Sequence, residues 1–301
     1  MVISSRAPLA TAAAGESPSG VEAFTLFDQF PEPGRSQLAA AFDEGRTRPE
    51  WCFVEGQVRL AFWASFPGSA PVTIWQFDPG PDPVAAAKAL RDSLRTMGLR
   101  KIIHDISLKP GLDPVVDRAV EHEALTLAGF VMEVERLVLE WVAGNDVPPD
   151  PGRLTYRPAR RMAEAEVIDI LVRISEGSLD HDTRIEVATS GAEREARWMY
   201  DDLVNRKGKP DWFVIGHLGD SPVGLVAPDD HSIAYIGVVP EHRGHGYVDD
   251  LLAKGTRTLA EAGVQRIVAV TDVANVPTAD AFLRAEYSEV GRLFRYYWRA
   301  S

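Results

Sequence analysis

The stretch IAYIGVVPEHRGHGYVDDLLAKG, residues 233–255, joins an apolar strand, a turn with two glycines and an amphipathic helix. A strand that leads directly into a helix leaves unpaired backbone N–H groups at the helix N-terminus, where the helix dipole is positive. Gly244 and Gly246 lack a Cβ, so an anion can approach these amides, and Arg243 can add a charge-assisted contact. The stretch therefore predicts a phosphate or pyrophosphate site.

Two familiar phosphate-binding motifs fit this stretch poorly. A P-loop ends in Gly-Lys-Ser/Thr, whereas Gly246 is followed by Tyr247 and Val248. A dinucleotide fingerprint requires a third glycine at the position that Asp249 occupies. Neither motif identifies the ligand.

The stretch instead resembles the signature of the GCN5-related N-acetyltransferase (GNAT) family, Arg/Gln-x-x-Gly-x-Gly/Ala after a Val-x-Pro step. That signature aligns with Val238-Val239-Pro240 and with Arg243-Gly244-His245-Gly246-Tyr247-Val248. Downstream, TDVANVPTADAFLRAEY is similar to the family's strand-Asn-helix-Gly-aromatic segment. The resemblance covers the chain from Leu154 to Arg299.

The resemblance implies an acetyl-CoA site in the C-terminal half. The amides around Gly244 to Val248 would hold the pyrophosphate, backbone groups of Val238 and Val239 would pair with the pantetheine arm, and Asn275 would lie near the thioester. The cofactor-binding residues that it implies are Val238, Val239, Arg243, Gly244, His245, Gly246, Tyr247, Val248, Asn275 and Phe282.

The sequence departs from the family pattern at several positions. Val248 replaces the closing Gly/Ala, and the pair Asp249-Asp250 adds negative charge near the expected pyrophosphate. Phe282 stands where many members carry the tyrosine that protonates the leaving thiolate, and phenylalanine has no proton to donate. Glu286 replaces the glycine before the aromatic residue. Because of Phe282, the sequence does not identify the group that protonates the leaving thiolate.

The general base is not evident on the strand before the turn. The positions where family members place a carboxylate or histidine are Ala234 and Ser232, and neither can act as a base near neutral pH. We therefore consider the segment SLDHDTR, expected to be a loop that helps form the acceptor pocket. Asp180 and His181 are the candidate catalytic residues there.

The chain divides at Ala143–Gly152, AGNDVPPDPG, whose prolines and glycines suit neither a helix nor a sheet. We expect a flexible tail at 1–20, a first domain at 21–142, a linker at 143–152 and a second domain at 153–301. Matching ends, ALTLAGFVMEVERLVLEW and FLRAEYSEVGRLFRYYW, suggest two copies of one fold. The expected fold class is α/β (α+β), with two GNAT-like, mostly antiparallel mixed sheets flanked by helices.

The first copy has no phosphate motif. Its equivalent of the turn, WQFDPGPDP at 75–83, contains three prolines, which lack the amide donors that a pyrophosphate needs. We therefore expect a degenerate GNAT-like domain that supports the second domain, shapes the acceptor pocket or mediates dimerisation, with a homodimer as a possible assembly.

Composition limits the class of protein. The 301 residues carry 44 acidic and 32 basic side chains, a net charge of −12, which disfavours nucleic-acid binding. Cys52 is the single cysteine, so disulfides and thiolate metal sites are not expected, and His242 and His245 have no third metal ligand nearby in sequence. No stretch of the sequence resembles a membrane span or signal peptide, so we expect a cytoplasmic protein.

Taken together, the sequence predicts an acetyl-CoA-dependent N-acetyltransferase that acts on a small amine. Its active site would lie in the C-terminal domain, and the acidic balance would favour cationic acceptors. Two alternatives remain open: a CoA-binding sensor whose catalysis has decayed, and an acyltransferase that uses another acyl donor.

Overall fold

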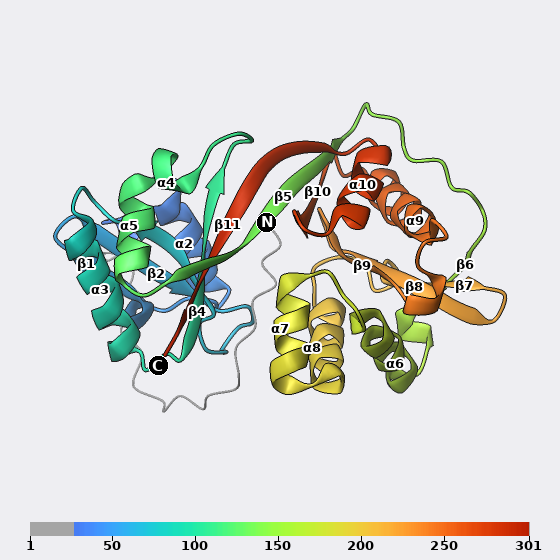
Figure 1. Ribbon diagram of the computed structural model, residues 1–301, viewed down its shortest axis with the longest axis horizontal. Helices are drawn as coiled ribbons and strands as arrows, with labels where there is room; N and C mark the ends of the chain where they lie inside the picture. The colour runs from blue at the N-terminus through green and yellow to red at the C-terminus, as the bar shows by residue number, and fades with distance from the viewer. Residues whose placement is uncertain (1–26, 301) are drawn as a thin grey trace. The chain divides into compact units, whose positions relative to one another are not determined.

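The computed structural model describes residues 27–300, so the tail expected at 1–20 lies outside the described residues. The chain forms two compact units (Figure 1). The N-terminal unit comprises residues 27–135 together with 293–300, and the C-terminal unit comprises Arg136–Arg292. The strands of the described residues form one sheet of seven and one of four, and each unit has its own hydrophobic core.

The N-terminal unit is a mixed sheet with helices on both faces. Its elements are α2 (Gly34–Asp43), η1 (Pro49–Trp51), β1 (Cys52–Glu55), β2 (Val58–Trp63), β3 (Thr73–Asp78), α3 (Pro83–Thr96), β4 (Lys101–Leu108), α4 (Pro114–Asp117), α5 (Ala119–Leu127), the start of β5 (Val131–Val142) and the end of β11 (Ser288–Arg299). Strands β1, β2 and β3 are antiparallel, and β3 pairs with β4 in parallel through Thr73 and Ile74 only.

Strand alternation explains the two faces of this sheet, because successive side chains point to opposite sides. On β2, Leu60 and Phe62 are buried in one cluster with the apolar faces of α3 and α5. Ala61, between them, belongs to a separate cluster with Leu38 of α2. The helices therefore cover the sheet from both sides (Figure 1).

The C-terminal unit contains the predicted motifs. Its elements are β6 (Thr155–Pro158), η2 (Ala159–Arg161), α6 (Glu164–Ser175), α7 (His181–Ser190), α8 (Ala192–Val204), β7 (Val214–Leu218), β8 (Ser221–Pro228), β9 (Ile233–Val238), η3 (Pro240–His242), α9 (Tyr247–Glu261), β10 (Arg266–Asp272) and α10 (Val276–Arg284). Strands β6, β7, β8 and β9 form an antiparallel sheet in that order.

The same alternation separates two cores in the C-terminal unit. Leu225 of β8 packs with α6 and α8, whereas its neighbour Val226 packs with α9. Figure 1 shows the four-stranded sheet with α6 and α8 on one side and α9 on the other. Helix α9 therefore begins at one end of the sheet with its apolar side against β8 and β9.

Strands β5 and β11 each begin in one unit and end in the other. Within the C-terminal unit, β10 pairs with the end of β5, from Arg266 opposite Val142 to Asp272 opposite Arg136. Within the N-terminal unit, β11 lies between β4 and β5. Each unit therefore contains a strand segment from the other half of the sequence, which the sequence analysis did not anticipate.

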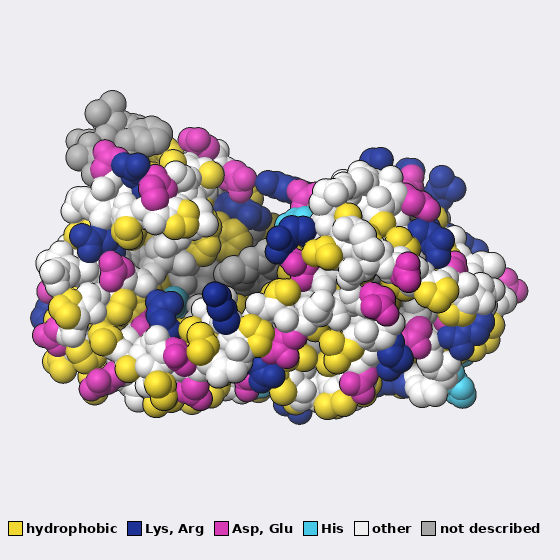
Figure 2. Space-filling view, turned by 90° about the horizontal axis from the view of Figure 1, so that it is seen from above, with side chains coloured by type: hydrophobic (Ala, Val, Ile, Leu, Met, Phe, Trp, Pro, Cys, Tyr) yellow, Lys and Arg dark blue, Asp and Glu magenta, His cyan; other side chains and the backbone are white. Residues whose placement is uncertain are grey.

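The surface carries both signs of charge. On the face drawn in Figure 2, acidic and basic side chains are interspersed with apolar ones and do not separate into a basic area. Within residues 27–300, no helix combines the length and the apolar character that crossing a membrane requires.

Candidate active site

The turn between β9 and α9 presents a series of bare amides. Gly244 and Gly246 both adopt left-handed backbone conformations, with φ of 79° and 76°, as the glycine pattern predicts. Within residues 27–300, the N–H groups of residues 244–248 have no hydrogen-bond acceptor. Five successive donors therefore lie at the positive end of a 15-residue helix.

Arg153 supports this turn from its carbonyl side. Its guanidinium donates to the carbonyl oxygens of His245 (3.0 Å) and Gly246 (2.9 Å), and lies 5.0 Å from the centre of the Tyr247 ring. It also forms an ion pair with Asp250, whose side chain is fully buried. The turn is thus held by a residue that precedes β6.

The two aspartates at the start of α9 are each paired with an arginine. Asp250 accepts hydrogen bonds from Arg153, and Asp249 accepts one from Arg284 at 2.8 Å. The negative charge expected to disfavour a diphosphate at this position is therefore offset locally. Val248 packs against the adjacent core, which places the bulk of its side chain among apolar neighbours.

Arg243, for which the sequence suggested a phosphate contact, bonds to the protein backbone in this structure. Its guanidinium donates to three carbonyl oxygens, those of Val238 (3.0 Å), Glu176 (2.6 Å) and Ile174 (2.8 Å). These bonds tie the turn to the end of α6. The donors of Arg243 are therefore directed to the protein backbone.

Strand β9 has an open edge beside the turn. Among the described residues, the backbone just before β9 pairs with β10 at an isolated bridge between Ser232 and Val268, and β9 itself shares no hydrogen-bonded ladder with β10. The N–H of Val239 donates to Val223 of β8 at 2.9 Å. Because backbone groups alternate between the two edges of a strand, the amides of Val238 and Ile236 point away from β8. This edge can accept an extended ligand.

Residues that follow β10 lie in two different environments. Asn275 is half-buried and stands at the N-cap position of α10, three residues after the end of β10. Phe282, the other residue that the resemblance implies here, is only 2% exposed and packs edge-to-face on Tyr287. Its side chain lies in the core beside α10.

The segment with the candidate catalytic residues is a helix terminus and not a loop. Asp180 caps α7 by accepting the Thr183 N–H at 2.7 Å, and α7 begins at His181. The N–H of His181 donates to Asp272 Oδ2 at 2.6 Å. The start of α7 therefore lies against the end of β10, on the approach to Asn275.

Arg136 organises the carboxylates at this point. Its guanidinium contacts Asp272 at 2.7 Å, Asp182 at 3.0 Å and Asp180 at 3.8 Å. Burial raises the pKa of Asp272, an effect that the adjacent Arg136 opposes. Of the three carboxylates only that of Asp180 is substantially exposed, at 38% of its side chain.

The equivalent helix terminus of the N-terminal unit is closed by its own side chain. The carboxylate of Asp82 accepts the N–H groups of Val84 (2.9 Å) and Ala85 (3.2 Å) at the start of α3. Pro83 is the first residue of this helix and has no N–H. The Asp82 carboxylate thus occupies the position that a bound anion takes at a helix N-terminus.

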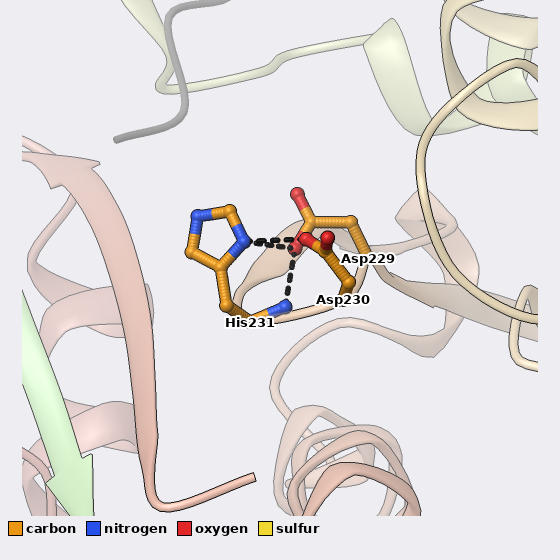
Figure 3. Close-up of side chains that lie close together, drawn as sticks. All are labelled: Asp229, Asp230 and His231. Atoms are coloured by element: carbon orange, nitrogen blue, oxygen red, sulfur yellow. Dashed lines mark hydrogen bonds and ion pairs between the residues drawn. The ribbon is translucent and has the colours of Figure 1, made fainter. Parts of the chain in front are cut away.

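Within residues 27–300, one group of acidic and histidine side chains has metal-ligand spacing: Asp229, Asp230 and His231 (Figure 3). Asp229 Oδ1 accepts the N–H groups of His231 (3.0 Å) and Ser232 (2.7 Å), and His231 Nδ1 lies 2.6 Å from Asp230 Oδ1. Arg206 lies 3.6 Å from Asp229. These contacts close the turn between β8 and β9.

Sequence reasoning missed two arginines that organise the site. Arg153 directly follows the predicted linker, and Arg136 lies on β5 in the other half of the sequence. For Arg153 the available signal was the pair Asp249-Asp250 at the start of the helix, because a carboxylate that becomes buried there, as Asp250 does, requires a countercharge.

In the C-terminal unit, an antiparallel sheet leads into a bare-amide turn beside the open edge of β9, an arrangement that fits an acyltransferase of the GNAT type. The model of the acetyltransferase (GNAT) family matches residues 167–287, and this part of the chain belongs to that family. The match includes the turn, the open edge of β9 and the start of α10.

Solved structures show the same fold over most of the chain. A tandem GNAT protein from the clavulanic acid biosynthesis pathway is 13% identical with a TM-score of 0.56, covering 95% of this chain and 97% of that one. A GCN5-related N-acetyltransferase from Sphaerobacter thermophilus is 12% identical with a TM-score of 0.55, covering 92% and 90%. One from Kribbella flavida is 15% identical with a TM-score of 0.53, covering 88% and 96%. No curated protein sequence matches the chain significantly.

Proposed function

We propose that the chain transfers an acetyl group from acetyl-CoA to a small cationic amine, and that the active site lies in the C-terminal unit. The observation that carries this proposal is the run of five unpaired amides at residues 244–248. A diphosphate matches such a row of donors in charge and in hydrogen bonding. Acetyl-CoA would supply an acetyl group activated as a thioester.

The residues of the C-terminal unit fit the rest of such a ligand. The free amides of Val238 and Ile236 would pair with the amide groups of the pantetheine arm, as in strand addition. The N–H of Val239 is already bonded to Val223, so we assign the pairing to the other two residues. Asn275, at the start of α10, would lie near the thioester end.

The carboxylates beside α7 support a cationic acceptor. Asp180, Asp182 and Asp272 all lie within 3.8 Å of the guanidinium of Arg136, so three carboxylates gather at this point. Asp180 is the member of this group that an ammonium ion can reach, because the others are buried. His181, next to it, is our candidate for accepting the proton of the amine.

We also propose that the N-terminal unit has lost CoA binding. Its helix α3 begins with a proline, and the Asp82 carboxylate occupies the next two amides. The negative charge of this carboxylate would also repel a phosphate. A role in supporting the C-terminal unit or in dimerisation remains our proposal for it.

A second function is favoured by Phe282, which stands where many members of the family carry a proton-donating tyrosine. Where a proton-donating side chain is lacking, the C-terminal unit could bind CoA as a sensor without turnover. The same site would serve both functions, so CoA binding alone does not distinguish a sensor from an enzyme. Formation of an acetylated product does distinguish them.

The test is to incubate the full chain with acetyl-CoA and a panel of amines while free thiol is measured. Thiol release that depends on one class of amine supports acetyl transfer, whereas binding without release on any amine supports the sensor. A ligand at about 100 times its Kd should stabilise the protein by about 2.7 kcal/mol, so binding is visible as a melting shift. A shift with another thioester but none with acetyl-CoA would contradict the assigned donor.

A further inference from the structure

Arg153 makes three kinds of contact around the turn that follows β9. Its Nη1 donates to the carbonyl of His245 at 3.0 Å and its Nη2 to the carbonyl of Gly246 at 2.9 Å. Its Nε lies 3.1 Å from the Asp250 carboxylate, and the Tyr247 ring covers the guanidinium at 5.0 Å. Among the described residues, no other side chain bonds to these two carbonyls, and the backbone N–H of Asp249 also donates to that of Gly246, at 3.1 Å.

Fixing these carbonyls also fixes two amides. In a planar trans peptide the C=O of one residue and the N–H of the next point in opposite directions. The carbonyl of His245 shares its peptide with the N–H of Gly246, and that of Gly246 shares its peptide with the N–H of Tyr247. Drawing both oxygens toward Arg153 therefore turns both N–H groups to the opposite side, where the diphosphate is proposed to bind.

Asp250 holds the guanidinium in this orientation. Its side chain is fully buried in the first turn of α9, and it accepts from both the side chain and the backbone N–H of Arg153. The hydroxyl of Tyr156 donates to the carbonyl of Asp250 at 2.9 Å, which ties β6 to the same turn of the helix. The hydrogen bond to Asp250 raises the pKa of Arg153, so the guanidinium stays charged.

We propose that Arg153, oriented by Asp250, is the positioning residue that aims the amides of Gly246 and Tyr247 at the diphosphate of CoA. This inference rests on the proposed function. Arg153 acts through the peptide groups and not through contact with the ligand, because its donors are directed to the protein.

A second ion pair at the same helix turn provides a matched control. Arg284 and Asp249 are 2.8 Å apart and have exposed side chains. Among the described residues, Arg284 bonds to neither carbonyl of the turn. Arg284→Lys replaces a guanidinium by an ammonium at the same helix turn, as Arg153→Lys does, but leaves the hydrogen bonds to the two carbonyls in place.

The experiment compares Arg153→Lys with Arg284→Lys by calorimetric titration with CoA and by competition with pantetheine, which lacks the diphosphate. A lysine ammonium is a point charge and cannot hold two carbonyls and a carboxylate in one plane. We expect Arg153→Lys to weaken CoA binding by about tenfold or more, equivalent to about 1.4 kcal/mol, and to leave pantetheine binding within about twofold. Arg284→Lys should change neither affinity.

Equal CoA affinity in folded Arg153→Lys, or an equal loss for both ligands, would overturn the inference. Asp250→Asn serves as a second variant if Arg153→Lys does not fold, and the same selective loss is expected. If neither variant folds, the pair is only a part of the fold and the inference is wrong. Failure of the unmodified chain to bind CoA would instead overturn the proposed function.

Discussion

Glu286 and Gly129 adopt the same left-handed backbone conformation, with φ of 63° and 91°, at the same place in the two units. Each is the residue directly after the C-cap of a helix. The C-cap is Ala285 for α10 and Ala128 for α5. The N–H of the next residue, Tyr287 or Phe130, donates back to the helix at 3.1 or 2.9 Å. These matching helix ends support the duplication that the sequence suggests.

Glu286 should be a site of strain that glycine relieves. A left-handed conformation costs a residue with a Cβ about 1–2 kcal/mol, and glycine loses part of this gain through its greater freedom in the unfolded chain. Glu286→Gly should therefore raise the free energy of unfolding by about 0.5–1 kcal/mol, measured by chemical denaturation.

The control for Glu286→Gly is Asp280→Gly, in the interior of α10 on an exposed position. A glycine there should destabilise the protein by about 1 kcal/mol. If both substitutions lower the stability, the left-handed conformation of Glu286 carries no strain and the explanation fails.

Arg136 should be essential to the C-terminal unit. It is 5% exposed and contacts the buried Asp272 and Asp182. Arg136→Ala leaves both carboxylates without this countercharge and should destabilise the protein by about 3–5 kcal/mol. The exposed pair of Arg160 and Asp211 offers the comparison, since Arg160→Ala should change stability little. Similar effects of the two substitutions in denaturation experiments would contradict the account.

Stability should depend on pH through His104 of the N-terminal unit. Its Nδ1 lies 2.9 Å from the Ile74 carbonyl and its Nε2 lies 2.7 Å from the Glu121 carboxylate, so both nitrogens face acceptors. Burial lowers the pKa of His104, but the hydrogen bond and charge of Glu121, with the Ile74 carbonyl, outweigh it and the pKa is raised.

Because the folded pKa is raised, the stabilisation by His104 is complete below its ordinary value of 6.5 and is lost as pH rises through the folded value. The difference in free energy of unfolding between the unmodified chain and His104→Gln should therefore shrink as pH rises from about 6 to about 9. Denaturation at several pH values measures it, and a difference that stays constant or grows would show that the imidazole is not charged.

Gly246 should be required for ligand binding because of the space that its missing side chain leaves, and not only because of its left-handed backbone conformation. A Cβ at Gly246 would lie 3.6 Å from Arg153 and from Asp249, and an aspartate would place a carboxylate at the proposed diphosphate site. Gly246→Asp should reduce CoA affinity by at least about 100-fold. Gly263→Asp, at another left-handed glycine with open space around it, should carry a comparable strain without affecting calorimetric CoA binding. Equal affinities for the two variants would remove the turn from the site.

Much of the C-terminal unit could be predicted because its signals are local. Arg266–Asp272 is a run of mostly apolar and β-branched residues and forms β10, and the helical spacing of apolar residues after Gly246 begins at Tyr247, where α9 begins. Helix α7 was missed, since SLDHDTR was interpreted as a loop although Asp180 has the residue type of an N-cap.

The remaining features depend on contacts between distant parts of the sequence. The sequence Val131–Val142 is typical of a strand, but it cannot show that the end of this strand pairs with β10, because a strand pattern does not identify its partner. For the same reason Arg136 could not be placed beside Asp272. Arg243 and Phe282 have residue types that fit a ligand site, and only packing shows where their side chains point.

The most direct test of the central claim is a crystal structure of the full chain with CoA. The account predicts the diphosphate on the amides of residues 244–248 and the pantetheine arm along the free edge of β9. A ligand bound at the start of α3, or a turn with no ligand at CoA concentrations that saturate the protein in solution, would contradict it.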